Sequence, residues 1–591
     1  MQESFKLILD YFKQYKKQFL IGILGLFLVD GLQIFIPWLV RKSINLLTET
    51  PENYRHILRY GLYILLLSIG VGLSRFMWRY FIIGISRKIE RNLRNRFYRH
   101  LQTLSYSYFD KTSVGDLMAH ATNDLEAIRM MCGMAVIAML DSGLLMVASI
   151  IMMLTINPVL TGYVVIPLPI ITLITLRMGP LMHDRFKKVQ KRFSDISQKA
   201  QETFAGIKVV KSFVQESEET KNFRQINTSY IDDNMRLVRV WGLMHPMIWT
   251  IGGLCGVIIL YAGGIRVIDG RMTIGDFVAF NSYLDILVWP MMAVGWVVNL
   301  YQRGRASLDR VYHILSLKSE IQDAPDAVER KIHGRIEFKN LTFSYNTGAP
   351  VLKNVSLSIP QGQWVAVMGP TGSAKTTLVN LISRLYDPPP NTVFIDGHDV
   401  HSFTLNSLRS QIAFVPQQTF LFSDTIANNI RFGTDISDER VEQLARLAQV
   451  YNDIDEFPER FATLVGERGV TLSGGQRQRV AIARALAVDT PVIIMDDSLS
   501  AVDTETEDAI VDNIKKLSDD RTVILISHRV STARKADIIV FLEDNEIVEM
   551  GTHDQLVALR GRYNDIYEHQ RLEQELEQSA DRSDPNGNGG V

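Results

Sequence analysis

The apolar run Trp364–Met368 is followed by a glycine-rich segment that reads Gly369-Pro370-Thr371-Gly372-Ser373-Ala374-Lys375-Thr376, and then by a helical pattern. A strand, a Gly-rich loop ending in Lys-Thr and a helix form a phosphate-binding arrangement, because backbone N–H groups and the helix N-terminus surround phosphate oxygens. Lys375 is expected to reach the β- and γ-phosphates, and Thr376 to ligate Mg²⁺. The pattern has glycine before the lysine. Ala374 stands there instead, and it adds backbone strain if this position needs a positive φ.

Two acids further along the chain complete this chemistry. The apolar run Pro491–Met495 is followed directly by Asp496 and Asp497. A carboxylate at the C-terminal end of a strand beside such a loop holds Mg²⁺ in P-loop nucleotide sites. The residues therefore predict a site for ATP and Mg²⁺ in which Thr376 and Asp496 hold the metal.

These residues lie in the second of two unlike halves of the 591-residue chain. After about residue 330, short apolar strands alternate with polar helices and Gly-rich turns, as in a soluble α/β domain. Before that point, six apolar stretches each approach the roughly 20 residues that cross hydrocarbon. They are residues 19–40, 58–84, 133–156, 159–179, 244–266 and 276–300. The predicted fold is an α-helical six-span membrane domain followed by an α/β P-loop ATPase domain.

Charge and cysteine content narrow the possible functions. The chain has 63 Lys+Arg against 64 Asp+Glu, which argues against a nucleic-acid partner, since that requires a basic surplus or stripe. The two cysteines, Cys132 and Cys255, exclude a disulfide scaffold and a Cys-rich zinc site. Basic residues concentrate in the long connections 86–131 and 181–240. By the positive-inside rule, both termini and the ATPase domain are expected to be cytoplasmic, in a multi-pass protein of the cytoplasmic (inner) cell membrane.

Composition also suggests the domain boundaries. We expect a membrane domain with long cytoplasmic helical arms at 1–318, a polar linker at 319–333, a nucleotide-binding domain at 334–575 and a disordered tail at 576–591. Each cytoplasmic arm contains a Gly-marked break, at 108–116 and at 203–207. A soluble domain could dock at such a break. Alternatively, the glycine only marks a turn and has no role in docking.

The segment Leu472-Ser473-Gly474-Gly475-Gln476 opens a helix, and in this context it resembles the signature of ABC transporters. The resemblance covers nearly the whole chain and implies further roles. Tyr345 resembles the aromatic residue that stacks on adenine, Gln417 the Q-loop residue that senses Mg²⁺, and His528 the switch histidine. Residues 500–503 resemble the D-loop, and residues 465–469 the exporter-specific segment before the signature.

Motifs and resemblance together imply three overlapping sets of site residues. The nucleotide-binding set is Tyr345, Gly369, Pro370, Thr371, Gly372, Ser373, Ala374, Lys375, Thr376, Thr377, Ser473, Gly474, Gly475, Gln476 and Asp503. The catalytic set is Asp497, His528 and Gln417, and the metal ligands are Thr376, Gln417 and Asp496.

Six spans fused upstream of one nucleotide-binding domain resemble an exporter-type half-transporter. In that family two halves pair, and two ATP molecules lie between the P-loop of one chain and the signature of the other. The resemblance therefore implies a second half-transporter as partner, with Ser473 and Gly475 contacting ATP held by that partner. The lipid bilayer and a hydrophobic or amphipathic small-molecule substrate are the other expected partners.

Asp497 is where the chain departs from hydrolytically competent members, which have glutamate there. Aspartate is shorter by one methylene, about 1.5 Å of reach, and a misplacement of about 1 Å can cost on the order of 10²-fold in rate. With an intact signature, this resembles the degenerate-site subunit of bacterial heterodimeric multidrug exporters. The chain's own site is then expected to bind MgATP and hydrolyse it slowly, while its signature completes the site of a non-identical partner. A homodimer with two slow sites is the alternative.

Ionisable residues in the predicted spans leave the transported substrate open. Asp30, Asp141 and Asp285 could line a cavity that favours amphipathic or cationic solutes, or they could pair with Arg75 or Arg79 or lie near an interface where water reaches them. The methionines and tryptophans of the spans suit an adaptable apolar pocket, and equally a packed bundle. The predicted function is ATP-driven multidrug-type export by alternating access. A dedicated lipid, peptide or precursor exporter and an ATP-gated channel or regulatory subunit are the alternatives.

Overall fold

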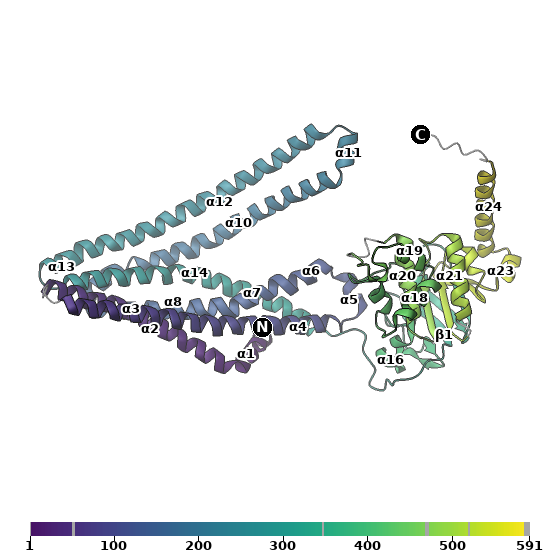
Figure 1. Cartoon of the computed structure of the whole chain (residues 1–591), viewed down its shortest axis with the longest axis horizontal. Helices are drawn as coiled ribbons and strands as arrows, with labels where there is room; N and C mark the ends of the chain where they lie inside the picture. Colours follow the sequence, from purple (N-terminus) through teal and green to yellow (C-terminus); the bar gives the residue numbers. More distant parts are fainter. Residues whose placement is uncertain (1, 50–53, 346–347, 467–471, 518–519, 584–591) are drawn as a thin grey trace. The chain divides into compact units, whose positions relative to one another are not determined.

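The computed structural model describes residues 2–49, 54–345, 348–466, 472–517 and 520–583. Its Cα positions divide the chain into two compact units, one helical and one containing the β-sheets (Figure 1). The first unit contains residues 1–103 and 112–317, and the second contains residues 104–111 and 318–591. Residues 104–111 therefore belong to the sheet-containing unit, although they come from the predicted membrane domain.

Six helical segments of the first unit are long and apolar enough to cross a membrane. They are Lys16–Thr48, Ile57–Leu101, Val114–Ile156, Pro158–Ala205, Glu216–Ile268 and Ile274–Ser316. Each contains one of the six apolar stretches identified in the sequence, so the prediction of six spans is confirmed. Several spans continue as helix well beyond the roughly 20 residues that hydrocarbon requires, as expected for helical arms.

The helices of this unit follow one another with few interruptions. They are α1 (Gln2–Gln14), α2 (Lys16–Glu49), α3 (Tyr54–Trp78), η1 (Arg79–Ile83), α4 (Gly84–Leu101), α6 (Val114–Ala119), η2 (His120–Asp124), α7 (Leu125–Met130), η3 (Met131–Ala135), α8 (Val136–Ile156), α9 (Pro158–Val165), α10 (Leu168–Ala205), α11 (Ile207–Ser212), α12 (Glu216–Ile258), η4 (Ile259–Gly263), α13 (Gly264–Ile268) and α14 (Ile274–Ser316).

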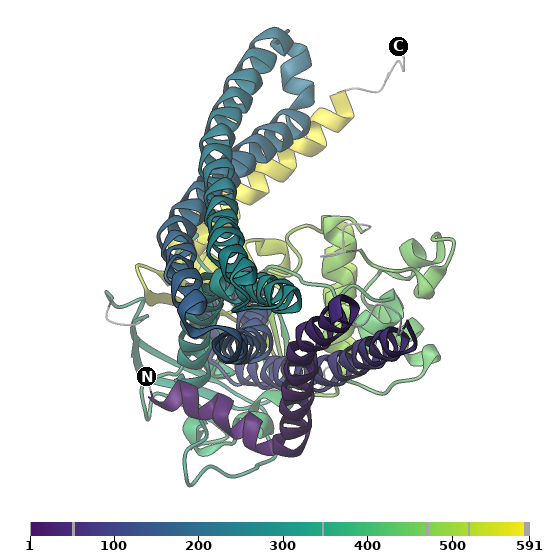
Figure 2. The ribbon, with the colours of Figure 1, turned by 90° about the vertical axis from the view of Figure 1, so that its left-hand side faces the viewer.

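Local sequence sets the ends of these helices. Asn157 is extended between α8 and α9, its side chain accepts a hydrogen bond from the Leu160 amide at 3.0 Å, and Pro158 begins α9. Thr273 and Asp276 form a capping box at the start of α14. Gly206 separates α10 from α11, at the predicted second break. Helices α10 and α12 run side by side, joined by α11, apart from the α2–α3 pair (Figure 2).

The second unit is built on two sheets. One has the order β2-β1-β4-β5, with β1 (Ile336–Phe343), β2 (Leu352–Ile359), β4 (Val393–Ile395) and β5 (His398–Asp399). The other has the order β10-β9-β3-β8-β7-β6, with β3 (Trp364–Met368), β6 (Ile412–Val415), β7 (Val492–Asp496), β8 (Thr522–Ile526), β9 (Ile538–Glu543) and β10 (Glu546–Gly551). In the second sheet β10 is antiparallel to β9, and the other neighbours are parallel.

Parallel pairing explains both the sequence pattern and the position of the site. Every residue of β3, β7 and β8 is buried, as in a sheet covered on both faces. These strands therefore read as uninterrupted apolar runs. Their carboxyl ends meet with that of β6 at one edge of the sheet, where open α/β sheets bind ligands.

The helices of this unit cover the sheets and connect the strands. They are α5 (Tyr106–Lys111), α15 (Lys375–Ile382), η5 (Val400–Ser402), α16 (Leu405–Ser410), α17 (Ile426–Arg431), α18 (Asp438–Leu447), α19 (Tyr451–Asp455), η6 (Arg460–Ala462), α20 (Gly474–Ala487), α21 (Thr504–Leu517), α22 (Val530–Ala533), α23 (His553–Leu559) and α24 (Arg562–Ser583).

Two features differ from the expected boundaries. Residues 319–333, expected as a linker, belong to the second unit. Helix α24 continues through residues 576–583, which were expected to be disordered. The helix is rich in Glu, Gln and Arg, and Arg571 pairs with Glu568 and Glu575 at helical spacing, which supports a helix that sequence polarity alone argued against. Residues 584–591 lie outside the described part of the chain.

Candidate nucleotide-binding site

The glycine-rich loop between β3 and α15 has the backbone that its residue types suggest. Gly369 has a φ of 142°, and a Cβ atom there would collide with the carbonyl oxygen of Leu542. Gly372 has a φ of 88°. Ala374, the N-cap of α15, is left-handed, with φ 69° and ψ 22°. This position therefore favours glycine, and alanine there costs about 1 kcal/mol of backbone strain.

Lys375 begins α15 and turns back over the loop. It is 6% exposed, and its Nζ donates to the carbonyl oxygens of Gly369 at 2.9 Å and Pro370 at 2.8 Å. Burial lowers the pKa of Lys375, and the nearby carboxylates of Asp497 and Asp496 oppose that effect. The ammonium group thus lies over the loop whose backbone suits phosphate oxygens.

Thr376 and Asp496 meet, although 120 residues separate them in the chain. The Thr376 Oγ1 donates to Asp496 Oδ1 at 3.0 Å. Burial raises the pKa of Asp496, and the hydrogen bond from Thr376 partly offsets this. A hydroxyl and a carboxylate oxygen in contact are hard oxygen donors of the kind that Mg²⁺ prefers. The two residues therefore fit the predicted metal ligands.

Asp497 and Gln417 line the same cavity as Asp496. Asp497 is left-handed, with a φ of 43°, and Gln417 Nε2 donates to its Oδ2 at 3.3 Å. Both residues line a cavity of about 270 Å³, together with His528 and the residues of the glycine-rich loop. The loop residues among the cavity lining are Thr371, Gly372, Ala374, Lys375, Thr376 and Thr377. The fold thus gathers residues from the ends of β3, β6, β7 and β8 around one space.

The signature lies at the start of α20. Ser473 and Gln476 form a capping box, in which the Gln476 amide donates to Ser473 Oγ at 3.2 Å and the Ser473 amide to Gln476 Oε1 at 2.9 Å. Gly474 and Gly475 approach Ala501 of the predicted D-loop, where a Cβ on Gly475 would lie 2.8 Å from the Ala501 carbonyl oxygen. The described residues 473–476 are not among those lining the 270 Å³ cavity. Residues 467–469 of the predicted exporter-specific segment lie outside the described residues.

The predicted D-loop and the switch histidine are joined by polar contacts. Asp503 Oδ1 accepts a hydrogen bond from the Thr506 amide at 2.9 Å, at the start of α21. Arg529, next to His528, donates from Nη1 to the Val502 carbonyl oxygen at 3.0 Å and also contacts Glu507. Glu507 is 2% exposed. Sequence reasoning missed it, because nothing in its spacing distinguishes it from the other acids of α21.

Tyr345 lies against α15, the helix that follows the glycine-rich loop (the loop helix). Its hydroxyl shares a hydrogen bond with Thr377 Oγ1 at 2.8 Å, and its ring meets that of Tyr386 edge-on, with 4.8 Å between the centroids. The Tyr386 hydroxyl donates to Asp110 of α5, and Tyr106 of α5 packs edge-on against the same ring. Tyr386 therefore connects the proposed adenine-stacking residue to α5, within the second unit.

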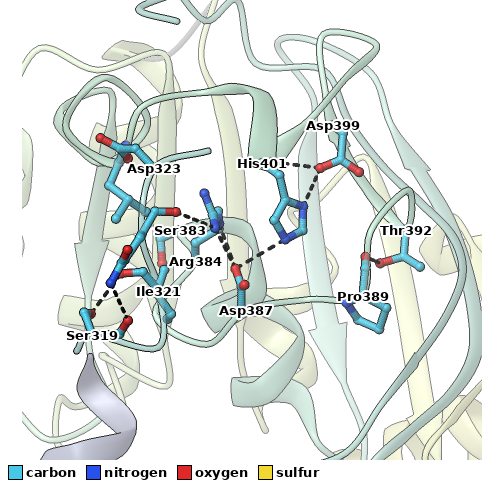
Figure 3. A network of polar contacts seen from close by, with 12 residues as sticks. Ser319, Ile321, Asp323, Ser383, Arg384, Asp387, Pro389, Thr392, Asp399 and His401 are labelled. Carbon is cyan, nitrogen blue, oxygen red and sulfur yellow. Dashed lines mark hydrogen bonds and ion pairs between the residues drawn. The ribbon is translucent and has the colours of Figure 1, made fainter. Parts of the chain in front are cut away.

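A polar network fixes the chain around Tyr386 (Figure 3). Asp387 Oδ1 accepts from Arg384 Nη2 at 2.8 Å and lies 3.3 Å from His401 Nε2. The Asp387 hydrogen bond, helped by Asp399, raises the pKa of His401. Arg384 is 2% exposed and has a left-handed backbone, with a φ of 50°. The network holds the end of the loop helix and the Tyr386 segment together.

In the first unit, the three acids of the predicted cavity are in different surroundings. Asp30 is 4% exposed; among the described residues no N–H or hydroxyl group hydrogen-bonds its carboxylate oxygens, and its side-chain partner is the carboxyl group of Asp141. Asp141 and Arg75 lie within electrostatic range of it. Arg75 donates to Gln33 Oε1 at 3.1 Å, and Arg79 lies over the Trp78 ring, so neither arginine forms a described ion pair with these acids. Asp285 is exposed.

A separate apolar pocket of about 680 Å³ lies between α10, α12 and α14. Trp241, Met244 and Trp296 contribute large apolar side chains, and the polar groups include His183, Asn299 and Gln302. None of the described residues that line it is an acid. The span residues Met244 and Trp296, which the sequence marked only as adaptable apolar residues, therefore share one cavity wall.

Comparisons with known proteins agree with this architecture. Residues 19–291 match the family model "ABC transporter transmembrane region", and residues 352–500 match the model "ABC transporter". The chain is 34% identical to the probable multidrug resistance ABC transporter ATP-binding/permease protein YheI of Bacillus subtilis, over 95% of this chain and 97% of that one. It is 34% identical to the multidrug resistance-like ATP-binding protein MdlA of Escherichia coli, over 96% of each chain.

Two further similarities bear on fold and substrate. The ATP-dependent lipid A-core flippase of Syntrophus aciditrophicus is 33% identical, over 98% of this chain and 97% of that one. The structure of a bacterial Atm1-family ABC exporter with ATP bound superposes with a TM-score of 0.78 at 25% identity, over 94% of this chain and 99% of that one. Six membrane helices, a P-loop ATPase domain and these matches show that the chain belongs to the ABC transporter family, as an exporter-type half-transporter.

Proposed function

We propose that this chain is one half of a heterodimeric exporter that moves amphipathic or hydrophobic solutes across the cytoplasmic membrane. Its own nucleotide site, built on Lys375 and Asp496 (the Walker A lysine and Walker B aspartate), binds MgATP and hydrolyses it slowly. Its signature, residues 472–476, completes the active site of a non-identical partner. The charge of the long connections favours cytoplasmic termini and a cytoplasmic nucleotide-binding domain.

The observation that carries this proposal is Asp497. It occupies the position of the attacking-water residue, follows the metal-binding Asp496, and lies in the cavity with Lys375 and His528. Its carboxylate is one methylene, about 1.5 Å, shorter than that of glutamate. Gln417 already engages it at 3.3 Å, which holds the carboxylate near the cavity wall. A general base that falls short of the water by about 1 Å loses on the order of 10²-fold in rate.

The remaining residues favour retention of nucleotide. Lys375 offers its ammonium group to the β- and γ-phosphates, and the amides of the loop surround the phosphate oxygens. Mg²⁺, when bound by Thr376 and Asp496, neutralises charge on those phosphates. His528 lines the cavity, where it would act on the terminal phosphate. Tyr345 does not line this cavity, but it lies beside Thr377 of the loop helix and would offer its ring to adenine. The site is thus suited to bind ATP firmly while Asp497 limits its cleavage.

The signature supports a role at a second site. Ser473 is exposed at the start of α20, and the helix N-terminus with its two glycines is available to phosphates from another chain. Since residues 473–476 are absent from the lining of the chain's own cavity, a partner's ATP is their natural ligand. The breaks near residues 110–116 and 203–207 of the cytoplasmic arms would then convey closure of the paired nucleotide-binding domains to the membrane helices and drive alternating access.

The 680 Å³ pocket favours hydrophobic or amphipathic solutes. Its volume lies in the range of small-molecule sites, and its walls combine aromatic and Met side chains with a few amide groups. A cationic solute would depend instead on Asp30 and Asp141, which do not line this pocket. Similarity to a lipid A-core flippase favours one alternative, a homodimeric lipid exporter with two slow sites.

Purification of the chain alone and with its candidate partner tests the proposal. The solitary chain in lipid nanodiscs should bind ATP but show little substrate-stimulated hydrolysis. Co-expression with a second half-transporter that has the Walker B glutamate should raise the rate on the order of 10²-fold. Robust substrate-stimulated hydrolysis by the solitary chain would overturn the heterodimer. Lipid export by the solitary chain, without drug export, would favour the homodimeric alternative.

A further inference from the structure

The C-terminal helix α24 reaches the segment that carries His528. Gln570 Nε2 donates to the His528 carbonyl oxygen at 2.8 Å, and Gln570 Oε1 accepts from the Val530 amide at 2.8 Å. One amide side chain therefore binds the backbone on both sides of Arg529. A bidentate contact of this kind fixes position as well as distance.

Within the segment, Ser527 Oγ accepts a hydrogen bond from the Arg529 amide at 3.0 Å, but the next amide, that of Val530, is bound from outside the segment. Arg529 is the N-cap of α22 (Val530–Ala533) and provides no side-chain cap. Serine, threonine, aspartate or asparagine would supply one from within the segment. Gln570 satisfies the first free amide of α22 from another helix instead. His528 itself is exposed toward the 270 Å³ cavity, so its position depends on how the backbone beneath it is held.

The N-terminal part of α24 packs tightly against its domain, so it can hold Gln570 in a fixed position. Tyr563 is fully buried, and its hydroxyl shares a hydrogen bond with His553 Nδ1 at 2.7 Å. Ile566 and Tyr567 pack against the core that includes Val530 and Ala533. Tyr563, Ile566, Tyr567 and Gln570 follow at helical spacing, so the packed stripe directs Gln570 to the His528 segment.

Beyond Gln570 the helix leaves the domain surface. Leu572 and Leu576 are 53% and 68% exposed, and α24, in yellow, projects from the rest of its unit (Figure 1). The last described contact of α24 with the nucleotide site is thus the one made by Gln570. On the opposite side, Glu507 holds the same segment through Arg529 and Thr532.

We infer that Gln570 is a positioning residue for His528, through which the C-terminal helix sets the preference of this site for ATP over ADP. The inference rests on the proposed function in one respect, that His528 acts on the terminal phosphate. Lys375 and the loop amides serve both nucleotides, whereas a displaced His528 affects only the γ-phosphate. Loss of Gln570 should therefore weaken ATP binding and spare ADP binding.

The test uses the full chain in nanodiscs and compares Gln570→Met with Arg571→Met. Methionine keeps the length of Gln570 and removes both hydrogen bonds. Arg571 is the neighbouring control, with described ion pairs only to Glu568 and Glu575 of the same helix. We expect Gln570→Met to raise the Kd for MgATP roughly fivefold, the equivalent of about one hydrogen bond, with the Kd for MgADP unchanged. Arg571→Met should change neither Kd.

A double-mutant cycle separates positioning from general destabilisation. In a His528→Ala background, Gln570→Met should have no further effect on the Kd for MgATP. Equal losses for ATP and ADP, or a full effect without His528, would overturn the inference. So would an unchanged Kd for MgATP in Gln570→Met when His528→Ala alone weakens it.

Amide hydrogen exchange covers the remaining case, in which His528→Ala itself has no effect on ATP binding. That result would show that the role given to His528 in the proposed function has failed. The contact is then judged by exchange at residues 528–531 alone. Exchange roughly fivefold faster in Gln570→Met, and unchanged in Arg571→Met, supports the positioning role, and unchanged exchange in both overturns it.

Discussion

Each unit of this chain contains a pair of neighbouring acids, and the two pairs are in opposite surroundings. In the nucleotide-binding unit, Asp496 receives a hydrogen bond from Thr376 and Asp497 receives one from Gln417. In the membrane unit, Asp30 is also buried, yet among the described residues its side-chain partner is another acid, Asp141, and no N–H or hydroxyl group reaches its carboxylate oxygens. A buried carboxylate with donors can build a metal site, whereas one without donors costs stability.

Burial alone does not decide whether an acidic side chain can hold a metal; the groups that hydrogen-bond it decide this as well. Asp496 and Asp497 are consecutive residues at the end of β7, so one strand delivers both to the same edge of the sheet. Asp30 and Asp141 come from different helices, α2 and α8, and meet only through packing. The local sequence keeps Asp496 and Asp497 together, whereas Asp30 and Asp141 are brought together only by the packing of the membrane helices. The following predictions test this contrast.

The largest effect is expected from Asp497→Glu. The longer side chain extends the carboxylate by about 1.5 Å, which should raise single-turnover hydrolysis at this chain's own site on the order of 10²-fold. The rate of ATP cleavage with protein in excess over ATP measures hydrolysis at this site directly. Asp497→Asn is the matched control and should lower the residual rate. An unchanged rate in Asp497→Glu would show that the length of this acid does not limit the site.

Lys375→Ala should weaken MgATP binding by roughly 10- to 100-fold, because it removes a charge-assisted contact worth about 1.5–3 kcal/mol. Equilibrium binding of a fluorescent ATP analogue measures the loss. Lys353, on β2, is a suitable control because it is exposed and outside the cavity lining. If Lys375→Ala bound ATP normally, the cavity at the sheet edge would not be the phosphate site.

Asp30→Leu should stabilise the chain by about 1–3 kcal/mol, since it replaces a buried carboxyl group whose described partner, Asp141, is another acid. Asp285→Leu removes an exposed acid of the same unit and should change stability little. Thermal unfolding in detergent compares the two variants. Destabilisation by Asp30→Leu would mean that the carboxylate has a partner in the assembled transporter, and the contrast between the two acidic pairs would disappear.

Ala374→Gly should have the smallest effect. Glycine adopts the left-handed backbone of this position without strain, so the variant should gain up to about 1 kcal/mol, or somewhat less once the greater freedom of glycine in the unfolded chain is included. A small rise in Tm, with tighter binding of MgATP, would be consistent with relaxation of the loop. Lower affinity would show that the alanine methyl group contributes to the site.

Much of the molecule could be predicted because its signals are local. Six apolar stretches correspond to six membrane-length helices, and β3 covers the predicted run Trp364–Met368. The extent of α24 and the membership of residues 104–111 in the nucleotide-binding unit could not be read in this way. The membership of residues 104–111 depends on a contact between distant segments, Tyr386 with Asp110, whereas the far end of α24 is exposed and rests on local ion pairs such as Arg571 with Glu575.

The amino-acid sequence alone specified the order of the domains, the glycine-rich loop before Lys375, the strand-ending Asp496 and the shorter acid, Asp497, that follows it. Each of these is a run of neighbouring residues whose chemistry depends on local backbone geometry. Only the tertiary structure decided which side chains support them. Gln570 reaches His528 from 42 residues away, and Thr376 reaches Asp496 from 120 residues away. Such contacts have no spacing rule, because the packing of strands and helices, and not the local chain, brings their atoms together.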